Sequence, residues 1–213
     1  MRFGVFGDVH GNLIALESFL KNVDKEVDGY ICTGDIVNYG PWSQECVERI
    51  KQLKNLICVR GNHEQIFLDK DMSKLSPLVR DFTETTIQHF SEFDWIRSLP
   101  LVSELGEFEI CHTLEGRYIF SDSDVQLQRS TIIGHSHQQF IRDLPNAKLV
   151  NPGSLGQNRK SIDVMEYMIY DYSFHRFEVF SVKYDFEKLL QKMKNLRYTQ
   201  KCIDYYVAKK LSS

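Results

Sequence analysis

Hydrophobic residues occur in short uninterrupted runs that alternate with stretches in which they recur every three or four positions. A run over residues 1–6 is followed by helical spacing over residues 13–23 and by a second run over residues 29–33. A buried strand, an amphipathic helix and another buried strand in this order predict a parallel pair. A helix over residues 43–53 and a strand over residues 56–59 continue the pattern, so we expect a right-handed βαβαβ unit.

The rest of the chain predicts further helices and then further strands. Residues 65–99 have helical spacing, with a start signal at Ser76 and Pro77. The later elements are expected as strands over residues 108–111, 131–133 and 149–150, a hairpin with strands over residues 164–170 and 177–182, and helices over residues 186–196 and 203–211. We expect a single domain over residues 1–213, with its motifs in residues 1–156 and a C-terminal hairpin and helices in residues 164–213.

Residue types that bind metals follow the predicted strands at their carboxyl ends. They are Asp8 and His10 after the first strand, Asp35 after the second, Asn62, His63 and Glu64 after the third, then His112, and finally His135 and His137. Ligand sites of open α/β sheets lie outside the carboxyl ends of the strands. We therefore expect these side chains to form one site, to which the turn at residues 151–154 adds backbone amides.

These side chains have a composition that suits a pair of metal ions. Without His63 and Glu64, the set offers two carboxylates, four imidazoles and one amide oxygen, which is too many ligands for one tetrahedral ion and enough for two. Ions about 3.5–4 Å apart need a carboxylate that bridges them, and mixed nitrogen and oxygen ligands favour manganese, iron or zinc over magnesium or calcium. Such a pair activates water and binds phosphate oxygens, so the pattern indicates hydrolysis.

Charge and cysteine content narrow the function classes. The 213 residues carry a formal net charge of −3, which makes nucleic acid an unfavoured partner, and no apolar run reaches the length of a membrane span. Because Met1 and Arg2 lead directly into a strand, we expect a cytoplasmic protein without a signal peptide. The five cysteines contain no Cys-x-x-Cys pair, and we assign them no catalytic role. The basic C-terminal helices predict a solvated face, with contact to an anionic partner as the alternative.

The ordered motifs resemble those of the calcineurin-like metallophosphoesterase superfamily. The blocks are Gly7 to Gly11, Gly34 and Asp35, Gly61 to Glu64, His112, and Gly134 to His137. Gly-His-Ser-His at residues 134–137 and Asn-Pro-Gly-Ser at residues 151–154 are most similar to the small bacterial and archaeal phosphodiesterase branch. The resemblance implies an α/β fold, a four-layer α/β/β/α sandwich with a metal site at the C-terminal ends of the strands.

The resemblance also implies a role for each motif residue. One metal would be held by Asp8, His10, Asp35 and His137, and the other by Asp35, Asn62, His112 and His135, so that Asp35 bridges the two. His63 would contact the phosphate or protonate the leaving oxygen, and Glu64 would orient it. Asn62 would also contact substrate. The implied cofactors are two divalent transition-metal ions, manganese first, with iron, zinc or nickel as alternatives.

The sequence departs from the protein Ser/Thr phosphatases of the superfamily. Where they carry Asp-Arg-Gly, this chain has Asn38, Tyr39 and Gly40, so their phosphate-binding arginine is missing at Tyr39. Arg60 is a candidate substitute for binding substrate, with an ordinary surface role as the alternative. The short interval between His112 and Gly134 leaves little room for a large insertion, so we expect an open pocket.

The resulting prediction is a metal-dependent hydrolase of phosphoric esters. The expected reaction is attack of a metal-bound hydroxide on a phosphodiester, with a nucleotide or dinucleotide as candidate substrate. The expected partner is this small phosphoester, with no membrane and with nucleic acid disfavoured, and the sequence does not predict the oligomeric state. One alternative is a phosphomonoesterase or Ser/Thr protein phosphatase. Another is a non-catalytic binding module, because a retromer scaffold subunit resembles this fold but lacks part of the catalytic set. A nuclease is a third, disfavoured by the acidic charge.

Overall fold

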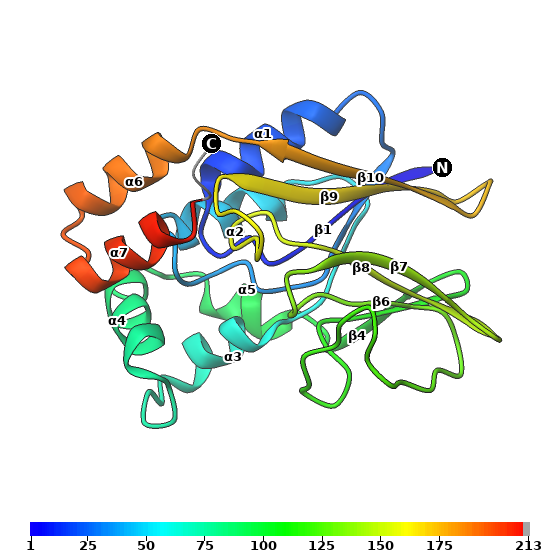
Figure 1. Ribbon diagram of the computed structural model, residues 1–213, viewed down its shortest axis with the longest axis horizontal. Coiled ribbons are helices and arrows are strands. Elements are labelled where there is room, and N and C mark those ends of the chain that lie inside the picture. Colours follow the sequence, from blue (N-terminus) through cyan, green and yellow to red (C-terminus); the bar gives the residue numbers. More distant parts are fainter. Residues whose placement is uncertain (211–213) are drawn as a thin grey trace.

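Two five-stranded sheets pack face to face in the computed structural model, which describes residues 1–210 (Figure 1). The first sheet has the order β10-β9-β1-β2-β3, with β1 at Arg2–Phe6, β2 at Gly29–Cys32, β3 at Leu56–Cys58, β9 at Val164–Asp171 and β10 at Arg176–Lys183. The strands β1, β2 and β3 are parallel, in a register that places Val5 beside Ile31 and Ile31 beside Ile57. The hairpin β9–β10 joins the sheet antiparallel to β1.

The second sheet has the order β4-β5-β6-β8-β7 and is also mixed. Its strands are β4 at Val102–Leu105, β5 at Phe108–Cys111, β6 at Thr131–Ile132, β7 at Gln139–Leu144 and β8 at Ala147–Pro152. The three central strands β5, β6 and β8 are parallel, so their carboxyl ends meet at one edge. That edge carries the loops that follow β5 and β6.

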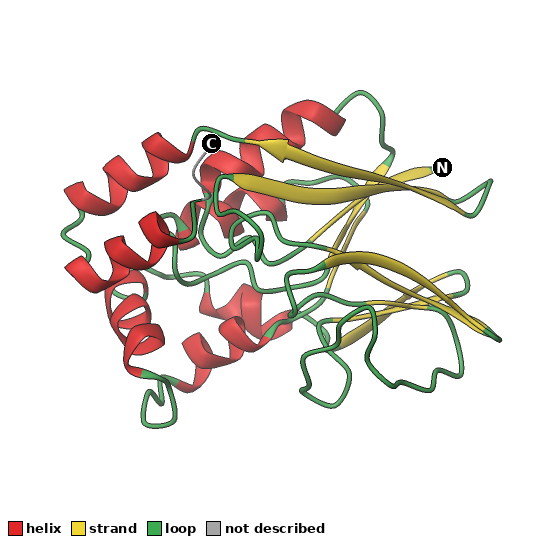
Figure 2. Cartoon of the chain, viewed as in Figure 1, coloured by secondary structure: helices red, strands yellow, loops and turns green. Residues whose placement is uncertain are grey.

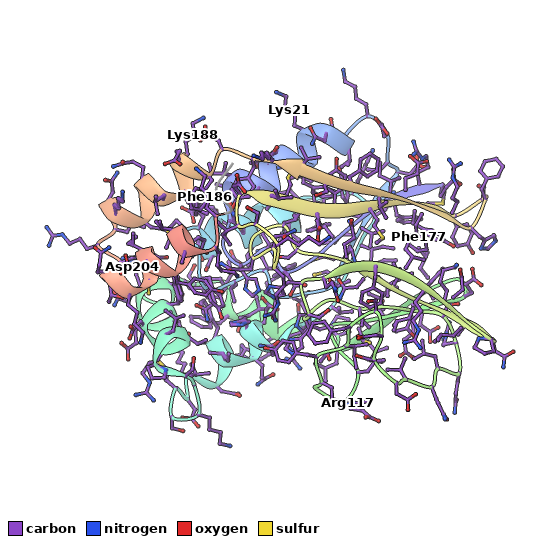
Figure 3. The ribbon with its side chains drawn as sticks, in the orientation of Figure 1. Lys21, Arg117, Phe177, Phe186, Lys188 and Asp204 are labelled. Atoms are coloured by element: carbon purple, nitrogen blue, oxygen red, sulfur yellow. The ribbon has the colours of Figure 1, made fainter. Side chains whose placement is uncertain are left out.

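Alternate residues of facing strands form the core between the sheets. Val5 and Ile31 of the first sheet pack in one buried cluster with Ile110 and Ile132 of the second. Neighbouring strand residues point the other way, because side chains alternate across a strand. Figure 3 shows Phe177 between the sheets, and it packs against this cluster.

The described residues contain seven helices. They are α1 at Leu13–Val23, α2 at Ser43–Lys51, α3 at Asn62–Asp69, α4 at Pro77–Thr86, α5 at Phe93–Ser98, α6 at Phe186–Asn195 and α7 at Gln200–Ala208. Figure 2 shows them along the outer side of the first sheet and gathered at one end of both sheets. This is the end at which β1 finishes, so the helices enclose the carboxyl edge where the predicted site lies.

The predicted α/β sandwich is therefore confirmed, with one difference in its outer layers. The outer face of the second sheet carries a separate apolar cluster that includes Cys111, Ile133 and Leu149. The residues packed on it include Ile119, Val125 and Leu127, which belong to the connection over residues 113–130. In the part of the chain that the structure describes, this connection takes the place of a helix on that face.

Most elements agree with the sequence, and the differences have local causes. The predicted helical stretch over residues 65–99 is divided into α3, α4 and α5, and Ser76 caps α4 as expected, accepting a hydrogen bond from Val79. The sequence does not predict the strand β7, because this segment forms a strand only through its pairing with β8. In α7 the buried face is formed by Cys202, Ile203 and Tyr206.

Further expectations concern the last helix, the number of domains and membrane-spanning segments. In the helix expected over residues 203–211, the apolar residue Val207 is exposed, and Leu211 lies outside the described residues. The single-domain organisation stays a prediction. None of the helices within residues 1–210 has the length and hydrophobicity needed to cross a membrane.

Candidate metal centre

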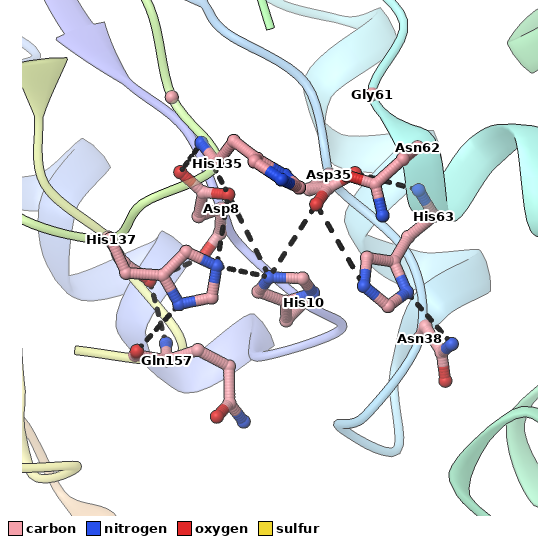
Figure 4. A network of polar contacts seen from close by, with 12 residues as sticks. Asp8, His10, Asp35, Asn38, Gly61, Asn62, His63, His135, His137 and Gln157 are labelled. Atoms are coloured by element: carbon pink, nitrogen blue, oxygen red, sulfur yellow. Dashed lines mark hydrogen bonds and ion pairs between the residues drawn. The ribbon is translucent and has the colours of Figure 1, made fainter. Parts of the chain in front are cut away.

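The carboxyl ends of five strands bring the predicted site residues together (Figure 4). Three segments of the first sheet contribute, since Asp8 and His10 follow β1, Asp35 follows β2 and Asn62 begins α3 just after β3. The second sheet adds His112 after β5, and His135 and His137 after β6. The site therefore lies where the edges of the two sheets meet.

The first cluster is formed by Asp8, His10, Asp35 and His137. One donor atom of each lies within 4.8 Å of the others. The Nε2 atoms of His10 and His137 are 3.1 Å apart, and His137 Nε2 is 3.3 Å from Asp8 Oδ1. His10 Nε2 lies 3.9 Å from both Asp8 Oδ1 and Asp35 Oδ2. Four donors of this kind around one point suit a transition-metal ion.

The second cluster is formed by Asp35, His112 and His135, again with donor atoms within 4.8 Å of one another. His112 Nε2 lies 3.1 Å from Asp35 Oδ2 and 3.2 Å from His135 Nδ1. Asn62 Oδ1 lies 3.0 Å from the same His112 nitrogen. Asp35 thus belongs to both clusters, as expected of a residue between two ions.

In two histidines, Nδ1 points away from the clusters and makes a hydrogen bond, which leaves Nε2 free to bind a cation. His112 Nδ1 donates to the carbonyl oxygen of Thr33 at 2.8 Å, and His137 Nδ1 donates to that of Gln157 at 2.8 Å. In a neutral imidazole this leaves Nε2 as the lone-pair nitrogen. His10 Nδ1 is buried and has no hydrogen-bond partner in the described residues. Lone pairs that converge in this way fit a bound metal ion.

The pKa values of the site follow from burial and close charges. Burial alone would raise the pKa of Asp35, but the His112 and His63 imidazoles beside it hold that pKa well below its usual range. Burial works against a charged His112, yet Asp35 raises its pKa to about 10. Burial and His112 lower the pKa of His135 to about 4. Without metal, a proton on His112 therefore balances the Asp35 charge, a task that a metal cation would take over.

Several predicted ligands have backbone conformations that cost energy. Positive φ angles occur at Asp8 (48°), His10 (48°), Asp35 (53°), His135 (67°) and His137 (56°). Left-handed backbone is unfavourable for residues other than glycine, at about 1–3 kcal/mol each, and persists where the surroundings enforce it. Here the amides of Asp8 and His10 donate to the carbonyls of Gly34 and Asp35, both at 3.0 Å. This concentration of strain is typical of a functional site.

The turn at residues 151–154 fixes the two ligand loops through its side chains, whereas the sequence predicted a contribution from its backbone amides. Asn151 Nδ2 donates to the carbonyl oxygen of Gly134 at 2.8 Å, and Ser154 Oγ donates to that of Asp8 at 2.7 Å. The amide of Gly156 also donates to the Asp8 carbonyl at 3.0 Å. A Cβ on Gly156 would lie 1.9 Å from the Val9 carbonyl oxygen, so only glycine permits this close approach.

Glu64 has a different task from the one predicted. Its carboxylate accepts four backbone hydrogen bonds of 2.7–3.1 Å, from the amides of Asp35, Ile36, Val37 and Gly61. Burial and the Asp35 charge raise its pKa to about 7. No hydrogen bond between Glu64 and the His63 ring occurs in the described residues. Glu64 therefore joins the loops after β2 and β3, and acts on His63 only by positioning its backbone.

The residue that orients the His63 ring is Asn38, a role that the sequence did not reveal. Asn38 Nδ2 lies 3.0 Å from His63 Nδ1 and 2.8 Å from Thr83 Oγ1. Its Oδ1 accepts from the Tyr39 amide at 2.7 Å and from Thr86 Oγ1 at 3.2 Å, which fixes the amide orientation. His63 Nδ1 is then an acceptor, so the hydrogen of the neutral ring is on Nε2, 4.0 Å from Asp35 Oδ2.

Arg60 lies apart from the two clusters. Its Nη1 lies 3.5 Å from the carbonyl oxygen of Arg97, and the side chain lines a neighbouring cavity of about 570 Å³ that also touches Asn62 and His112. The cavity directly in front of Asp35 and His63 does not include Arg60. The substrate-binding role of Arg60 stays a prediction, and the structure places the side chain at the cavity beside Asn62 and His112 instead of at the cavity in front of His63.

The cavity at the metal-binding side chains has a volume of about 120 Å³ and is narrower than expected. It is lined by Asp35, Tyr39, His63, Tyr118, His135, His137, Arg159, Tyr205 and Lys209. The short interval after His112 predicted an open pocket. Instead, the walls of the cavity include Tyr118 from residues 113–130, Tyr205 of α7 and Lys209, the C-cap of α7. Arg159, Tyr205 and Lys209 were not predicted as site residues, because nothing local in the sequence links them to the motifs.

Comparison with known proteins agrees with the fold and with the motif order. Residues 1–184 match the family model of the calcineurin-like phosphoesterases. An uncharacterized protein from Methanocaldococcus jannaschii is 30% identical over 221 residues, covering 89% of this chain and 90% of that protein. A crystal structure of a metallophosphoesterase from Sphaerobacter thermophilus matches with a TM-score of 0.81 and 24% identity, covering 98% of this chain and 99% of that one.

A shorter match involves an enzyme with a defined substrate. The symmetrical bis(5'-nucleosyl)-tetraphosphatase of Vibrio cholerae is 31% identical over 114 residues. The alignment covers 51% of this chain and 42% of that enzyme. This likeness therefore concerns about half of the chain and less than half of the enzyme.

Proposed function

Because the chain belongs to the calcineurin-like phosphoesterase family, we propose that it hydrolyses a phosphodiester with the help of two divalent metal ions. The observation that carries the proposal is Asp35, whose carboxylate belongs to both donor clusters. In this assignment Asp8, His10, Asp35 and His137 hold one ion, and Asp35, Asn62, His112 and His135 hold the other. Manganese is the preferred metal, since the donors mix imidazole nitrogen with carboxylate and amide oxygen.

The metals and the protein divide the chemistry between them. When bound, the two metal ions would supply a water molecule of lowered pKa and neutralise negative charge on the phosphate. In its protonated form His63 gives the Nε2 proton to the leaving oxygen and becomes neutral, and Asn38 supports this role by holding the ring at Nδ1. The His63 backbone amide donates to Asp35 Oδ1 at 2.8 Å, which keeps the donor beside the bridging ligand. Burial lowers the pKa of His63, which makes its protonated ring a stronger acid toward the leaving oxygen.

A nucleotide or dinucleotide is the proposed substrate class. The likeness to the bis(5'-nucleosyl)-tetraphosphatase, which covers 51% of the chain, supports it. Two further cavities offer space for substituents on the phosphate: one of about 190 Å³ shares His137 and Arg159 with the 120 Å³ cavity, and one of about 570 Å³ is lined by Asn62 and His112. A compound with a group on both sides of its phosphate suits this arrangement.

Metal-stripped protein is expected to hydrolyse bis(p-nitrophenyl) phosphate only after a transition metal is restored, and to do so faster than p-nitrophenyl phosphate. The measurement is initial rate with manganese, iron, zinc, nickel or magnesium added singly. A preference for the monoester would contradict the diester assignment and favour a phosphatase. Absence of turnover with every metal and both substrates would favour the binding module.

Asn38→Ala is expected to lower kcat about tenfold to a hundredfold, the range seen when a residue that orients a catalytic histidine is lost. The free energy of unfolding should also fall, by about 1–3 kcal/mol, because buried polar partners lose their hydrogen bonds. Steady-state kinetics and urea unfolding measure the two effects. An unchanged kcat in a variant with normal manganese content would show that Asn38 does not position His63 for catalysis.

A further inference from the structure

Two cations line the same cavity as the candidate metal-binding side chains. Arg159 follows the turn at residues 151–154, and Lys209 is the C-cap of α7, which lies beyond residues 1–184 that match the family. Both residues line the same cavity of about 120 Å³ as Asp35 and His63. The C-terminal helix therefore contributes to this cavity, although it lies outside the part of the chain that identifies the family.

Arg159 is held in place through its Nε and its flat face. Nε donates to the carbonyl oxygen of Ser136 at 3.0 Å, between two predicted ligands in the sequence. The guanidinium lies over the Tyr118 ring, 5.5 Å from its centre, and Tyr118 stacks on His135 with ring centres 4.1 Å apart. These contacts leave the two terminal nitrogens without a protein acceptor in residues 1–210, although the side chain reaches the cavity.

Lys209 is half-buried and makes contacts only with uncharged groups in the described residues. Nζ donates to the Tyr205 hydroxyl at 2.9 Å and to Gln157 Oε1 at 3.3 Å. Burial and the nearby Arg159 charge lower its pKa to about 8. Two nearby cations without a carboxylate between them repel each other, which makes the charged form of each less favourable. An anion bound between them would remove this repulsion.

The neighbouring basic residues behave differently. Lys210 Nζ lies 2.8 Å from Glu187 Oε1, and Lys160 Nζ lies 3.8 Å from Glu166 Oε1. Within residues 1–210, neither Arg159 nor Lys209 has such an ion pair. The absence of a carboxylate partner therefore distinguishes the two cations of the cavity from the basic residues next to them in the sequence.

We propose that Arg159 and Lys209 form a phosphate-binding site that holds the substrate's phosphoryl oxygens facing away from the metals. This inference rests on the proposed function and assigns α7 to substrate binding. It also accounts for Tyr39, which stands where Ser/Thr phosphatases have their phosphate-binding arginine. The Tyr39 ring stacks on Tyr205 of α7 with centres 6.1 Å apart, so it supports the helix whose C-cap is Lys209.

The test compares Arg159→Met and Lys209→Met with the controls Lys188→Met and Lys210→Met, whose lysines form ion pairs with Asp185 and Glu187, all in the full chain. Isothermal titration calorimetry measures the affinity of the manganese-loaded proteins for inorganic phosphate. We expect each cavity variant to bind phosphate about tenfold or more weakly, as loss of a charged hydrogen bond implies, and the controls to bind like the wild type. With bis(p-nitrophenyl) phosphate, KM should rise more than kcat falls.

Two further comparisons make the result specific. Arg159→Lys should recover part of the phosphate affinity if the charge binds the anion, whereas a purely structural role would leave it as weak as Arg159→Met. A loss of kcat/KM shared by bis(p-nitrophenyl) phosphate and diadenosine tetraphosphate would place the reacting phosphate at the two cations, and a loss confined to the dinucleotide would place a neighbouring phosphate there.

Phosphate affinity and KM equal to those of the wild type in folded Arg159→Met and Lys209→Met would overturn the inference. This outcome is distinct from failure of the proposed function, which would appear as absence of turnover in the wild type. The calorimetric titration does not depend on turnover, so it tests the phosphate site in either case. Circular dichroism of each variant confirms that it is folded.

Discussion

Asp35→Asn is expected to abolish turnover and to reduce the manganese bound per chain from two ions to one or none. The Asp35 carboxylate is common to both donor clusters, with Oδ2 3.1 Å from His112 Nε2 and 3.9 Å from His10 Nε2. An amide has the same shape but no charge, and with its oxygen at the Oδ1 position its NH2 group faces both donor clusters, so it cannot bridge two cations. Losing several kcal/mol of charge stabilisation corresponds to a loss of rate of about a thousandfold or more.

The change should leave the fold intact, because the amide oxygen of the substituted side chain can still accept the hydrogen bond that Asp35 Oδ1 receives from the His63 amide. The measurements are metal content after dialysis, kcat with bis(p-nitrophenyl) phosphate, and thermal unfolding. Asp124→Asn serves as the matched control, since Asp124 is exposed on the 113–130 connection. An Asp35→Asn variant that turns over substrate without added metal would contradict the assignment.

The sequence predicts the first part of the site well because the relevant order is local. Asp8, Asp35 and Asn62 each come directly after a glycine at a strand end, and parallel strands bring those ends to one edge. Short uninterrupted apolar runs likewise predict the parallel strands β1, β2 and β3. Both inferences need only the spacing of residues within one βαβαβ unit.

The functions of Asn38 and Glu64 depend on contacts that the sequence does not encode locally. Asn38 follows Asp35 closely, yet its amide is oriented by Thr83 and Thr86 of α4, which pack beside it only in the folded chain. Glu64 adjoins His63 in the sequence, which favours an interaction between the side chains. In the fold its carboxylate instead accepts hydrogen bonds from the loop after β2.

The cationic wall of the cavity could not be predicted for the same reason. Lys209 is one of many basic residues in the C-terminal helices, and a solvated face was the reasonable expectation for all of them. The packing of Tyr205 against Tyr39 and Phe82 turns this part of α7 toward the site. Only that tertiary contact separates Lys209 from Lys210, which forms an ion pair with Glu187.

His63→Ala is expected to lower kcat about a hundredfold to ten thousandfold, the usual contribution of a general acid, and to leave the metal content unchanged. His63 belongs to neither donor cluster, and its Nε2 lies 4.0 Å from Asp35 Oδ2, beyond hydrogen-bond distance. Removing the ring therefore removes a proton donor and no ligand. His89→Ala is a matched control, because His89 is exposed and lies outside the cavity.

The leaving group separates acid catalysis from a general loss of structure. A p-nitrophenolate leaves readily without a proton, whereas the alcohol of a nucleoside needs one, so His63→Ala should reduce nucleoside ester hydrolysis more than hydrolysis of bis(p-nitrophenyl) phosphate. The comparison requires kcat for both substrates in the wild type and the variant, with manganese content measured on the same samples. An equal loss for both substrates would argue against a proton donor. A loss of manganese would instead make His63 a ligand, since only a direct contact or a collapse of the Asp35 loop could couple its ring to metal binding.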